Sequence, residues 1–439
     1  MKKAIFDAKT HLLMRRELRT FREMRRNEVM SAPELVRFTD ESSAKIALHA
    51  FDNSPFYRSL YSDAGFTRDD VAIAANFTRL PVVTKDRLRD AGDDVLALNI
   101  SAGRALASQT GGSTGSPLRV RNDAAAPTAA MWWRMYRWWG VHPADDTAFI
   151  YRRLRQGKDA WQYALQWWPS RHLLLDARAI TESSMEQFIS RWQRVRPRLL
   201  VAYVEGATAV ATHLEQTDRK LVTTAVSVTA ATLQPGQREL LERVFEAPVF
   251  DTYRSAEIPW IAAECAAHRG LHVAADQRRV EILDEQRRPV RRGAEGSVVV
   301  TDFSNEVFPL VRYEMGDRSR AVEGECVCGL VFPRIEAVQG RISDVVRTPS
   351  GKQITGGLSG LFLESPGAIR QMQIIQHADL SITLRYVGRS ENDADAAVAA
   401  AVRKLSALLD DEVRIAAVAV DAIESVAGKA RLVISEVQA

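Results

Sequence analysis

Short apolar runs alternate with amphipathic stretches between about 105 and 300, and this rhythm constrains the fold more than any other feature of the sequence. The β-rich runs span 147–151, 198–203, 224–228 and 248–253, and the helical patterns include 183–195 and 237–245. Repeats of strand, helix and strand form parallel sheets that helices cover on their faces. The sequence therefore predicts an α/β fold for this part of the chain.

The pattern changes in the last third of the chain. Between 276 and 320, alternating runs such as RRVEILD and GSVVVTDF lie between glycine and proline turns, as in antiparallel hairpins. Beyond 340, the strands MQIIQ and SITLRYV, an Ala-rich helix over 393–409 and the strand VRIAAVAV indicate a small α+β unit. We therefore predict a large domain with parallel and mixed sheets over 1–340 and a small, mobile C-terminal domain over 341–439.

Composition excludes several classes of protein. With 46% hydrophobic residues and a formal charge of +4 in 439 residues, the chain is expected to be globular. Positive and negative charges are interleaved, so no nucleic-acid groove is expected. The Arg-rich stretch 14–26 is interpreted as a surface helix, with a membrane or RNA contact as the alternative. No apolar run approaches the ~18 residues that cross a bilayer, so we expect a cytoplasmic protein without an integral membrane segment.

A Gly-rich loop is the first candidate functional element. SQTGGSTGSP (108–117) combines glycines with hydroxyl residues, so that backbone N–H groups can approach a phosphate closely. A plain turn is the alternative interpretation. A P-loop would end in Gly-Lys-Ser/Thr, but the nearest lysine on the C-terminal side is Lys158. A phosphate site here would need a cation from elsewhere in the chain.

The motifs of the chain occur in an order that resembles one enzyme family. They are LPVVTKDRL (80–88), the Gly-rich loop, DTYRSAEIPWIAAEC (251–265), GLHV (270–273), FPLVRYEMGD (308–317), GRISD (340–344) and AGKAR (427–431). The series resembles the phenylacetate-CoA ligase family, and within it the capsular-polysaccharide-type branch, of the adenylate-forming superfamily of acyl-CoA synthetases, peptide-synthetase adenylation domains and luciferases. The resemblance covers nearly the whole chain and implies ATP-dependent activation of a carboxylic acid as an acyl-AMP.

The resemblance assigns the ATP phosphates to the loop, to a carboxylate and to a distant lysine. Glu257 matches the carboxylate that such enzymes use near Mg²⁺, a role that suits a hard oxygen ligand. Lys429 matches a lysine that the small domain carries to the reacting carboxylate and α-phosphate, and would provide the missing cation. The implied phosphate-binding residues of the loop are Ser108, Thr110, Gly111, Gly112, Ser113, Thr114 and Gly115, with Thr110 also implied in catalysis.

Other motif residues are implied at the nucleoside and at the hinge. Tyr253 matches the aromatic ring beside adenine, and Asp317 matches the carboxylate that accepts hydrogen bonds from the ribose hydroxyls. Arg341 matches an arginine that contacts the nucleotide. Asp344 matches the hinge about which the small domain rotates. These assignments come from the resemblance, because Gly-Asp alone is usually a turn.

The nucleotide motifs depart from the superfamily pattern at two places. In the usual Tyr-Gly-x-Thr-Glu, this chain has Arg254 for Gly and an alanine for Thr, with Ser255 between them. The resemblance implies that Arg254 and Ser255 bind the nucleotide with the rest of this motif. A hydroxyl that is often near the α-phosphate is therefore absent. Ala230 and Ala231 stand where a Gly-Glu pair is common, so only backbone contacts to adenine are expected there.

The three cysteines cluster with histidines between 265 and 328. Cys326 and Cys328 form a Cys-x-Cys pair, and on an extended strand both thiols would point to one face. With Cys265 and one histidine they would give the four N/S ligands that tetrahedral zinc favours. Similar Cys and Gly-Leu-His positions in the family can bind a structural zinc, which favours His272 over His268. Buried thiols without a metal are the alternative.

Tryptophan is concentrated in the segment 131–168. On a helix over about 125–139, Trp132, Tyr136 and Trp139 share one face, whereas Trp133 points elsewhere. In the family, the helix after the loop contributes to the aryl-acid pocket, so Trp132, Tyr136 and Tyr203 are candidate pocket residues. A core stripe is the alternative interpretation.

The function that the sequence predicts is adenylation of a carboxylic acid, with ATP, Mg²⁺ and a structural Zn²⁺ as cofactors. Coenzyme A is the expected acyl acceptor. An amine, a sugar amine or a carrier-protein thiol is the alternative, because VVRTPSGKQITGGL after GRISD differs from the apolar stretch usual in the family. A non-catalytic binding or assembly component is a second alternative, and a homodimer stays open.

Overall fold

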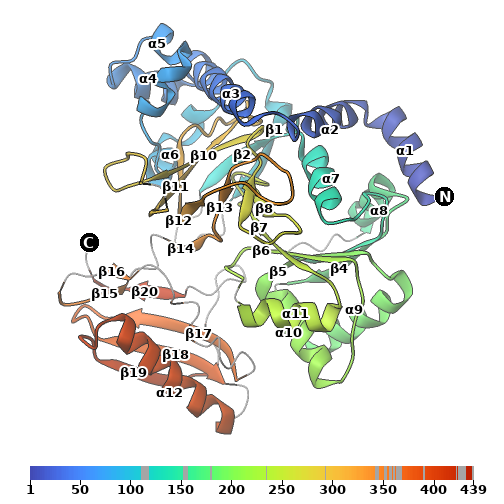
Figure 1. The fold of residues 1–439 in the computed structure, drawn as a ribbon, viewed down its shortest axis with the longest axis vertical. Coiled ribbons are helices and arrows are strands. Elements are labelled where there is room, and N and C mark those ends of the chain that lie inside the picture. Colours follow the sequence, from blue (N-terminus) through green and yellow to red (C-terminus); the bar gives the residue numbers. More distant parts are fainter. Residues whose placement is uncertain are drawn as a thin grey trace.

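The computed structural model has a large N-terminal body and a smaller C-terminal body (Figure 1). It describes the chain apart from residues 110–117, 152–156, 178–179, 234, 292, 342–345, 351–352, 355–357, 359–360, 362–367, 389–390, 422, 424–431 and 438–439. A large mixed sheet flanked by helices and a small second sheet confirm the predicted α/β fold with a small α+β unit.

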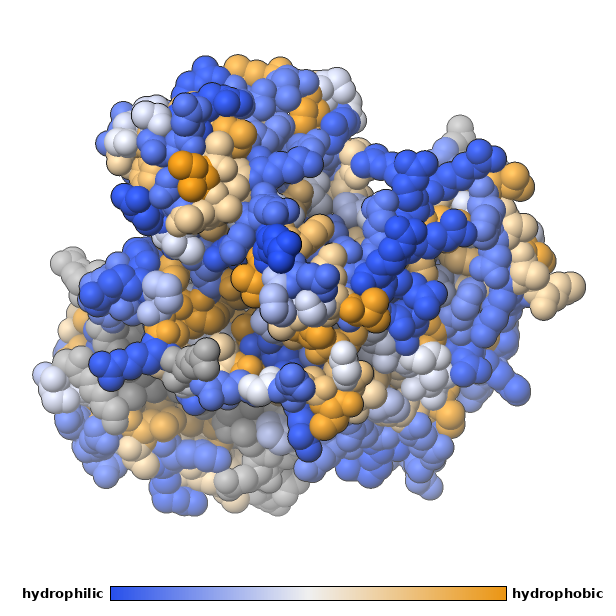
Figure 2. All heavy atoms as spheres, turned by 45° about the horizontal axis from the view of Figure 1, so that its top comes forward, coloured by the Kyte–Doolittle hydropathy of each residue, from blue (hydrophilic) through white to orange (hydrophobic). Residues whose placement is uncertain are grey.

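Helices form the N-terminal part of the large body. They are α1 (Lys2–Leu13), α2 (Arg15–Asn27), α3 (Ala32–Asn53), α4 (Pro55–Asp63), α5 (Arg68–Ala72) and α6 (Lys85–Ala91), with 3₁₀ turns at Ala74–Arg79, Gly92–Val95 and Ala102–Arg104. As predicted, the Arg-rich stretch is a surface helix: the arginines of α2 are exposed and Met24 is buried against α7 (Thr128–Trp138). Figure 2 shows a largely hydrophilic surface with scattered hydrophobic patches in this part of the molecule.

Parallel strands form one half of the large sheet, in the order β4-β3-β5-β6-β7. They are β3 (Thr147–Tyr151), β4 (His172–Asp176), β5 (Leu199–Tyr203), β6 (Ala225–Thr229) and β7 (Val249–Tyr253). The predicted bounds of β3, β5, β6 and β7 were correct within one residue, because each run is apolar and bounded by turn residues, whereas β4 was not predicted. The intervening helices are α8 (Gly157–Trp167), α9 (Glu182–Val195), α10 (Val204–Gln216) and α11 (Pro235–Phe245).

Antiparallel strands form the other half of the sheet, in the order β10-β11-β12-β13-β9-β8 and then β7. They are β8 (Ala262–Glu264), β9 (Leu271–Val273), β10 (Arg278–Leu283), β11 (Glu295–Asp302), β12 (Tyr313–Val322), β13 (Arg334–Ile335) and β14 (Gln339–Arg341), which pairs with β12. Strand β7 pairs in parallel with β6 and antiparallel with β8. The two halves of the sheet therefore meet at β7.

The smaller body has its own sheet, in the order β19-β18-β17-β20. Its elements are β15 (Val346–Arg347), β16 (Gln353–Ile354), β17 (Ile369–Gln376), β18 (Ile382–Gly388), α12 (Glu391–Leu408), β19 (Ile415–Ala419) and β20 (Val433–Ser435). Ile374, Leu384 and Leu405 are buried in its core. The boundary after 340 stays a prediction. Among the described helices, none is both long and apolar enough to cross a bilayer.

Candidate active site

The carboxyl ends of the parallel strands bring predicted site residues to one edge of the sheet. Tyr203 ends β5, Tyr253 ends β7, and Ala230 directly follows β6. Tyr151, which sequence analysis did not select, ends β3, and its ring lies 4.8 Å from that of Tyr203. Ligands of open α/β sheets bind at this edge. The end of each predicted strand was the signal that would have identified Tyr151.

Tyr253 and Asp317 are in direct contact. The Tyr253 hydroxyl donates a 2.8 Å hydrogen bond to Oδ2 of Asp317, which lies on β12. Burial, followed by repulsion from Asp317, raises the pKa of Tyr253 well above its usual range, so the phenol stays protonated as a donor. The backbone of Arg341 on β14 is in register with Asp317. An aromatic ring and a carboxylate are thus held side by side.

Glu257 is a buried carboxylate four residues beyond the end of β7, with 6% of its surface exposed. The Tyr313 hydroxyl donates a long, 3.4 Å hydrogen bond to its Oε1. Among the described residues, no side-chain cation lies within ion-pair distance of Glu257. A buried carboxylate is costly without a positive partner, so this residue suits a hard divalent cation.

The two strands that flank the Gly-rich loop both contact the motif that contains Glu257. Strands β1 (Ala105–Gln109) and β2 (Arg119–Asp123) form an antiparallel pair. Ser108 Oγ and Asn122 Nδ2 each donate a 3.4 Å hydrogen bond to the Ala256 carbonyl oxygen. The described ends of the loop therefore lie beside Glu257. The predicted phosphate-binding residues from Thr110 to Gly115, the hinge residue Asp344 and the predicted catalytic Lys429 lie outside the described residues.

Arg254 is surrounded by aromatic rings. Its guanidinium carbon lies 5.4 Å from the Trp132 ring centre, 5.6 Å from that of Tyr151 and 4.7 Å from that of Trp260. Its Nη1 also donates a 2.9 Å hydrogen bond to the Tyr151 hydroxyl. The side chain thus points into the aromatic cluster at the strand ends. Ser255, the next residue, is half-buried, and its Oγ accepts a 3.0 Å hydrogen bond from the Ile258 N–H, so it closes the turn after β7.

Ala230 adopts a backbone conformation that favours glycine, with φ of +76°. The turn after β6 needs a left-handed residue there, and a Cβ makes that conformation costly. The common Gly at this motif position therefore has a physical reason. Ala231 adopts no such conformation.

The aromatic face of α7 lies as the sequence predicted. The rings of Trp132 and Tyr136 are 5.5 Å apart, and those of Tyr136 and Trp139 are 6.4 Å apart. Trp133 packs on the opposite side against Phe6, with ring centres 5.7 Å apart. Tyr136 and Trp139 are buried in the core, whereas Trp132 is half-buried beside Arg254. Trp132 is therefore better placed than Tyr136 to contact a ligand.

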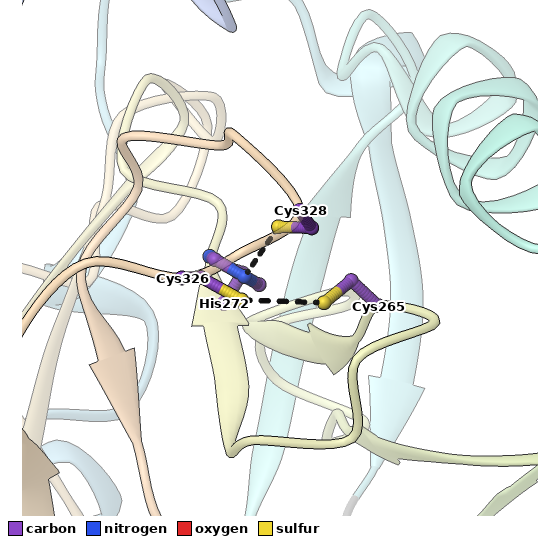
Figure 3. A group of neighbouring side chains, drawn as sticks. All are labelled: Cys265, His272, Cys326 and Cys328. Carbon is purple, nitrogen blue, oxygen red and sulfur yellow. Dashed lines mark hydrogen bonds between the residues drawn. The ribbon is translucent and has the colours of Figure 1, made fainter.

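Three cysteines and one histidine converge at the antiparallel end of the sheet (Figure 3). The ligand atoms of Cys265, His272, Cys326 and Cys328 all lie within 4.8 Å of one another. Cys265 Sγ is 3.7 Å from Cys326 Sγ, and Cys328 Sγ is 3.3 Å from His272 Nε2. This donor set suits tetrahedral zinc.

The histidine of this cluster is prepared for ligation. His272 Nδ1 lies 3.0 Å from the Phe332 carbonyl oxygen, so a proton on Nδ1 would be held there and Nε2 would face the thiols. Burial lowers the pKa of His272 and keeps the ring neutral, which is the form that binds metals. The alternative ligand His268 lies apart from the cluster, where Nδ1 is 3.2 Å from Glu264 Oε2.

One expectation about the cysteines was wrong. Cys326 and Cys328 do not lie on an extended strand but in the turn between β12 and β13. The Gly329 N–H donates a 3.0 Å hydrogen bond to the Cys326 carbonyl oxygen, and Gly329 has φ of +79°. A tight turn closed at a glycine brings both thiols to one side, which side-chain alternation along a strand was expected to do.

A hollow of about 540 Å³, lined by Glu264, Arg269 and neighbouring residues, opens beside β9 and contains none of the predicted nucleotide residues.

Two known proteins are similar in sequence to this chain over most of its length. The chain is 23% identical over 353 residues to Protein CapK of Staphylococcus aureus, covering 78% of this chain and 70% of CapK. It is 22% identical over 368 residues to the phenylacetate-coenzyme A ligase of Thermus thermophilus, covering 79% of each. No family model matches the chain.

Solved structures with the same fold extend the comparison. A 2-hydroxyisobutyryl-CoA ligase in the postadenylation state, in complex with R3-HIB-AMP, gives a TM-score of 0.77 at 19% identity over 94% of this chain and 91% of its own. The amide bond synthetase McbA from Marinactinospora thermotolerans gives 0.53 at 16% identity over 73% of this chain and 66% of its own. The chain therefore has the fold of the adenylate-forming ligases. Within that class, its relatives match the phenylacetate-CoA ligase-like proteins, which confirms the predicted resemblance.

Proposed function

We propose that this chain adenylates a carboxylic acid with ATP and then passes the acyl group to coenzyme A. A carboxylate oxygen of the acid would attack the α-phosphorus, the bond from that phosphorus to the β-phosphate bridging oxygen would break, and pyrophosphate would leave. The thiol sulfur would then attack the acyl carbon and release AMP. The observation that carries this proposal is the Tyr253–Asp317 pair beside buried Glu257 at the edge of the sheet where ligands bind.

The described residues would have different roles in the adenylation step. Tyr253 would stack beside adenine, and Asp317 would accept hydrogen bonds from the ribose hydroxyls. Glu257 would hold the Mg²⁺ that neutralises the phosphates, since its carboxylate is buried without a described cation. Lys429 would contribute positive charge where the acid meets the α-phosphate.

The four-residue cysteine and histidine cluster would hold a structural zinc. Four protein ligands fill a tetrahedral site and leave no open position for a substrate, so the metal would stabilise the β12–β13 turn rather than take part in the reaction. It would tie this turn to β9 and to the residue after β8.

The identity of the acceptor has a second candidate. The stretch after the GRISD motif is polar here, and the amide bond synthetase shares the fold. Transfer to an amine, a sugar amine or a carrier-protein thiol is therefore the alternative to coenzyme A.

ATP–pyrophosphate exchange tests the adenylation step directly. We expect exchange with at least one acid of a panel of aromatic, fatty and hydroxy acids, and a loss of at least two orders of magnitude in Lys429→Ala. If ATP binds but no acid supports exchange, the fold serves as a binding or assembly component instead. Consumption of coenzyme A, measured with the active acid, separates thioester formation from transfer to an amine.

A further inference from the structure

Three buried arginines of the large body have anionic partners, whereas Arg254 has none among the described residues. Arg134 pairs with Asp276 at 2.8 Å, Arg278 with Asp302 at 2.6 Å, and Arg312 with Glu281 at 3.0 Å. Arg334 instead donates to backbone carbonyl oxygens. Within the described part of the chain, no carboxylate lies within ion-pair distance of Arg254. A half-buried guanidinium without a counter-charge is costly, so its charge needs an explanation.

The aromatic rings around Arg254 fix its direction and leave hydrogen-bonding capacity unused. Trp132, Tyr151 and Trp260 lie within 5.6 Å of its guanidinium carbon. Such contacts orient a cation but accept no conventional hydrogen bond from its N–H groups. Only Nη1 has a side-chain acceptor among the described residues, the Tyr151 hydroxyl at 2.9 Å. The other N–H groups of the guanidinium can therefore bind a ligand.

The position of Arg254 in the site indicates which ligand this is. It follows Tyr253, the residue assigned to adenine, and precedes Glu257 by three residues. Its side chain contacts Trp132 and Tyr151, and Tyr151 in turn contacts Tyr203, so it enters the aromatic cluster proposed for the acid. Where the superfamily has Gly, this chain thus places a cation at the acid-binding part of the site.

We propose that Arg254 is a specificity-determining residue that binds a second anionic group on the acid substrate. The substrate is then a carboxylic acid that carries another carboxylate, a phosphate or a sulfonate beyond the carboxylate that reacts. A planar guanidinium binds such oxyanions through two parallel hydrogen bonds, and the aromatic rings exclude water around the pair. This inference rests on the proposed adenylation only for the identity of the reacting carboxylate.

Matched pairs of acids test the inference in the exchange assay. Each pair has the same size, with a methyl group in one member and a carboxylate, phosphonate or sulfonate in the other. We expect kcat/KM to be at least about tenfold higher for one of the anionic acids than for its methyl analogue. Comparing the carboxylate, phosphonate and sulfonate pairs identifies which anion the site prefers. Equal or better exchange with every methyl analogue would overturn the inference.

Binding measured without catalysis keeps this inference separate from the proposed function. Trp132 and Trp260 lie against Arg254, so their fluorescence reports an anion bound to the guanidinium. Saturable quenching by an anionic acid, without exchange, would support the subsite and contradict adenylation. Equal binding of the anionic acid and its methyl analogue would overturn the subsite whatever the exchange assay shows.

Variants of Arg254 distinguish an acid subsite from a phosphate contact. Arg254→Gln should raise KM for the anionic acid about tenfold or more, leaving KM for ATP and for the methyl analogue unchanged. Arg254→Lys keeps the positive charge but cannot form two parallel hydrogen bonds to one oxyanion, so its KM for the anionic acid should be intermediate. The matched control is Arg243→Gln on α11, which breaks an exposed pair with Glu215 and a 3.4 Å hydrogen bond to the Glu239 carbonyl oxygen, and should change neither KM. A rise in KM for ATP alone would place the guanidinium at the phosphates and overturn the inference.

Discussion

The hydroxyl of Tyr253 donates a 2.8 Å hydrogen bond to Asp317, which lies 64 residues further along the chain. The contact links the end of β7, where the parallel and antiparallel halves of the sheet meet, to β12. It also fixes one oxygen of Asp317. Two motifs that are distant in sequence therefore form one nucleoside site in the proposed function.

The first prediction concerns this pair. Asp317→Asn removes the charge that would accept the ribose hydroxyls, so KM for ATP should rise about tenfold or more. Tyr253→Phe keeps the ring and loses only the hydrogen bond, so its effect should be a fewfold rise. The measurement is ATP–pyrophosphate exchange at varied ATP. If both variants keep the KM of the unmodified protein, the nucleoside does not bind here.

The second prediction concerns the metal. The purified protein should contain about one equivalent of zinc, and Cys328→Ser should lower both the zinc content and the melting temperature, because the metal would join the β12–β13 turn to β9. His268→Ala is the matched control, since this histidine lies apart from the cluster and should leave the zinc content unchanged. Well under one equivalent of zinc in the unmodified protein would contradict the proposed site.

The strands in the parallel half of the sheet could be predicted because their bounds depend on neighbouring residues in the sequence. Buried strands such as β6 are apolar runs between turn residues, so their bounds follow from the sequence. The order of the strands is set by tertiary packing and does not follow from the sequence. The contact between Tyr151 and Arg254 depends on that order and could not be predicted, although the place of Tyr151 at a strand end could.

Site residues that belong to sequence motifs could be identified from the sequence, but the geometry of the turns that hold some of them could not. Tyr253 and Asp317, which the motif resemblance implies at the nucleoside, are in direct contact, and their roles stay predictions. The convergence of Cys326 and Cys328 was expected for the wrong reason, because alternation along a strand cannot describe a turn closed at Gly329. Positive φ at Ala230 was also invisible in the sequence, since alanine rarely adopts it.

The third prediction uses that strained alanine. Ala230→Gly removes the Cβ from a residue with φ of +76°, so it should stabilise the large body by about 0.5–1 kcal/mol after the entropy of glycine is subtracted. The measurement is the midpoint of urea unfolding. Ala231→Gly is the matched control, because its backbone is not left-handed and the change should destabilise. Equal shifts in both variants would contradict strain at Ala230.

The fourth prediction concerns Asp251, which lies buried in β7 just before the site. Burial, followed by repulsion from Glu264, raises the pKa of Asp251 from 3.8 to about 7. An acid whose pKa is higher in the folded chain binds its proton on folding. Its contribution to stability is therefore complete below pH 4 and is lost as the pH rises to about 7.

Asp251→Asn keeps a neutral side chain of the same shape, so it should remove this loss. Unfolding in urea at pH 5 and pH 8 measures the effect. At pH 5 the folded Asp251 is still protonated and only part of its contribution is lost, so the advantage of the variant should be small there. At pH 8 that advantage should be larger by roughly 1–3 kcal/mol, because each pKa unit between pH 5 and about 7 corresponds to about 1.4 kcal/mol. The exposed Glu285→Gln is the control and should show no such difference between the two pH values. A variant equally stable or less stable at pH 8 would mean that the Asp251 carboxylate is compensated when ionised.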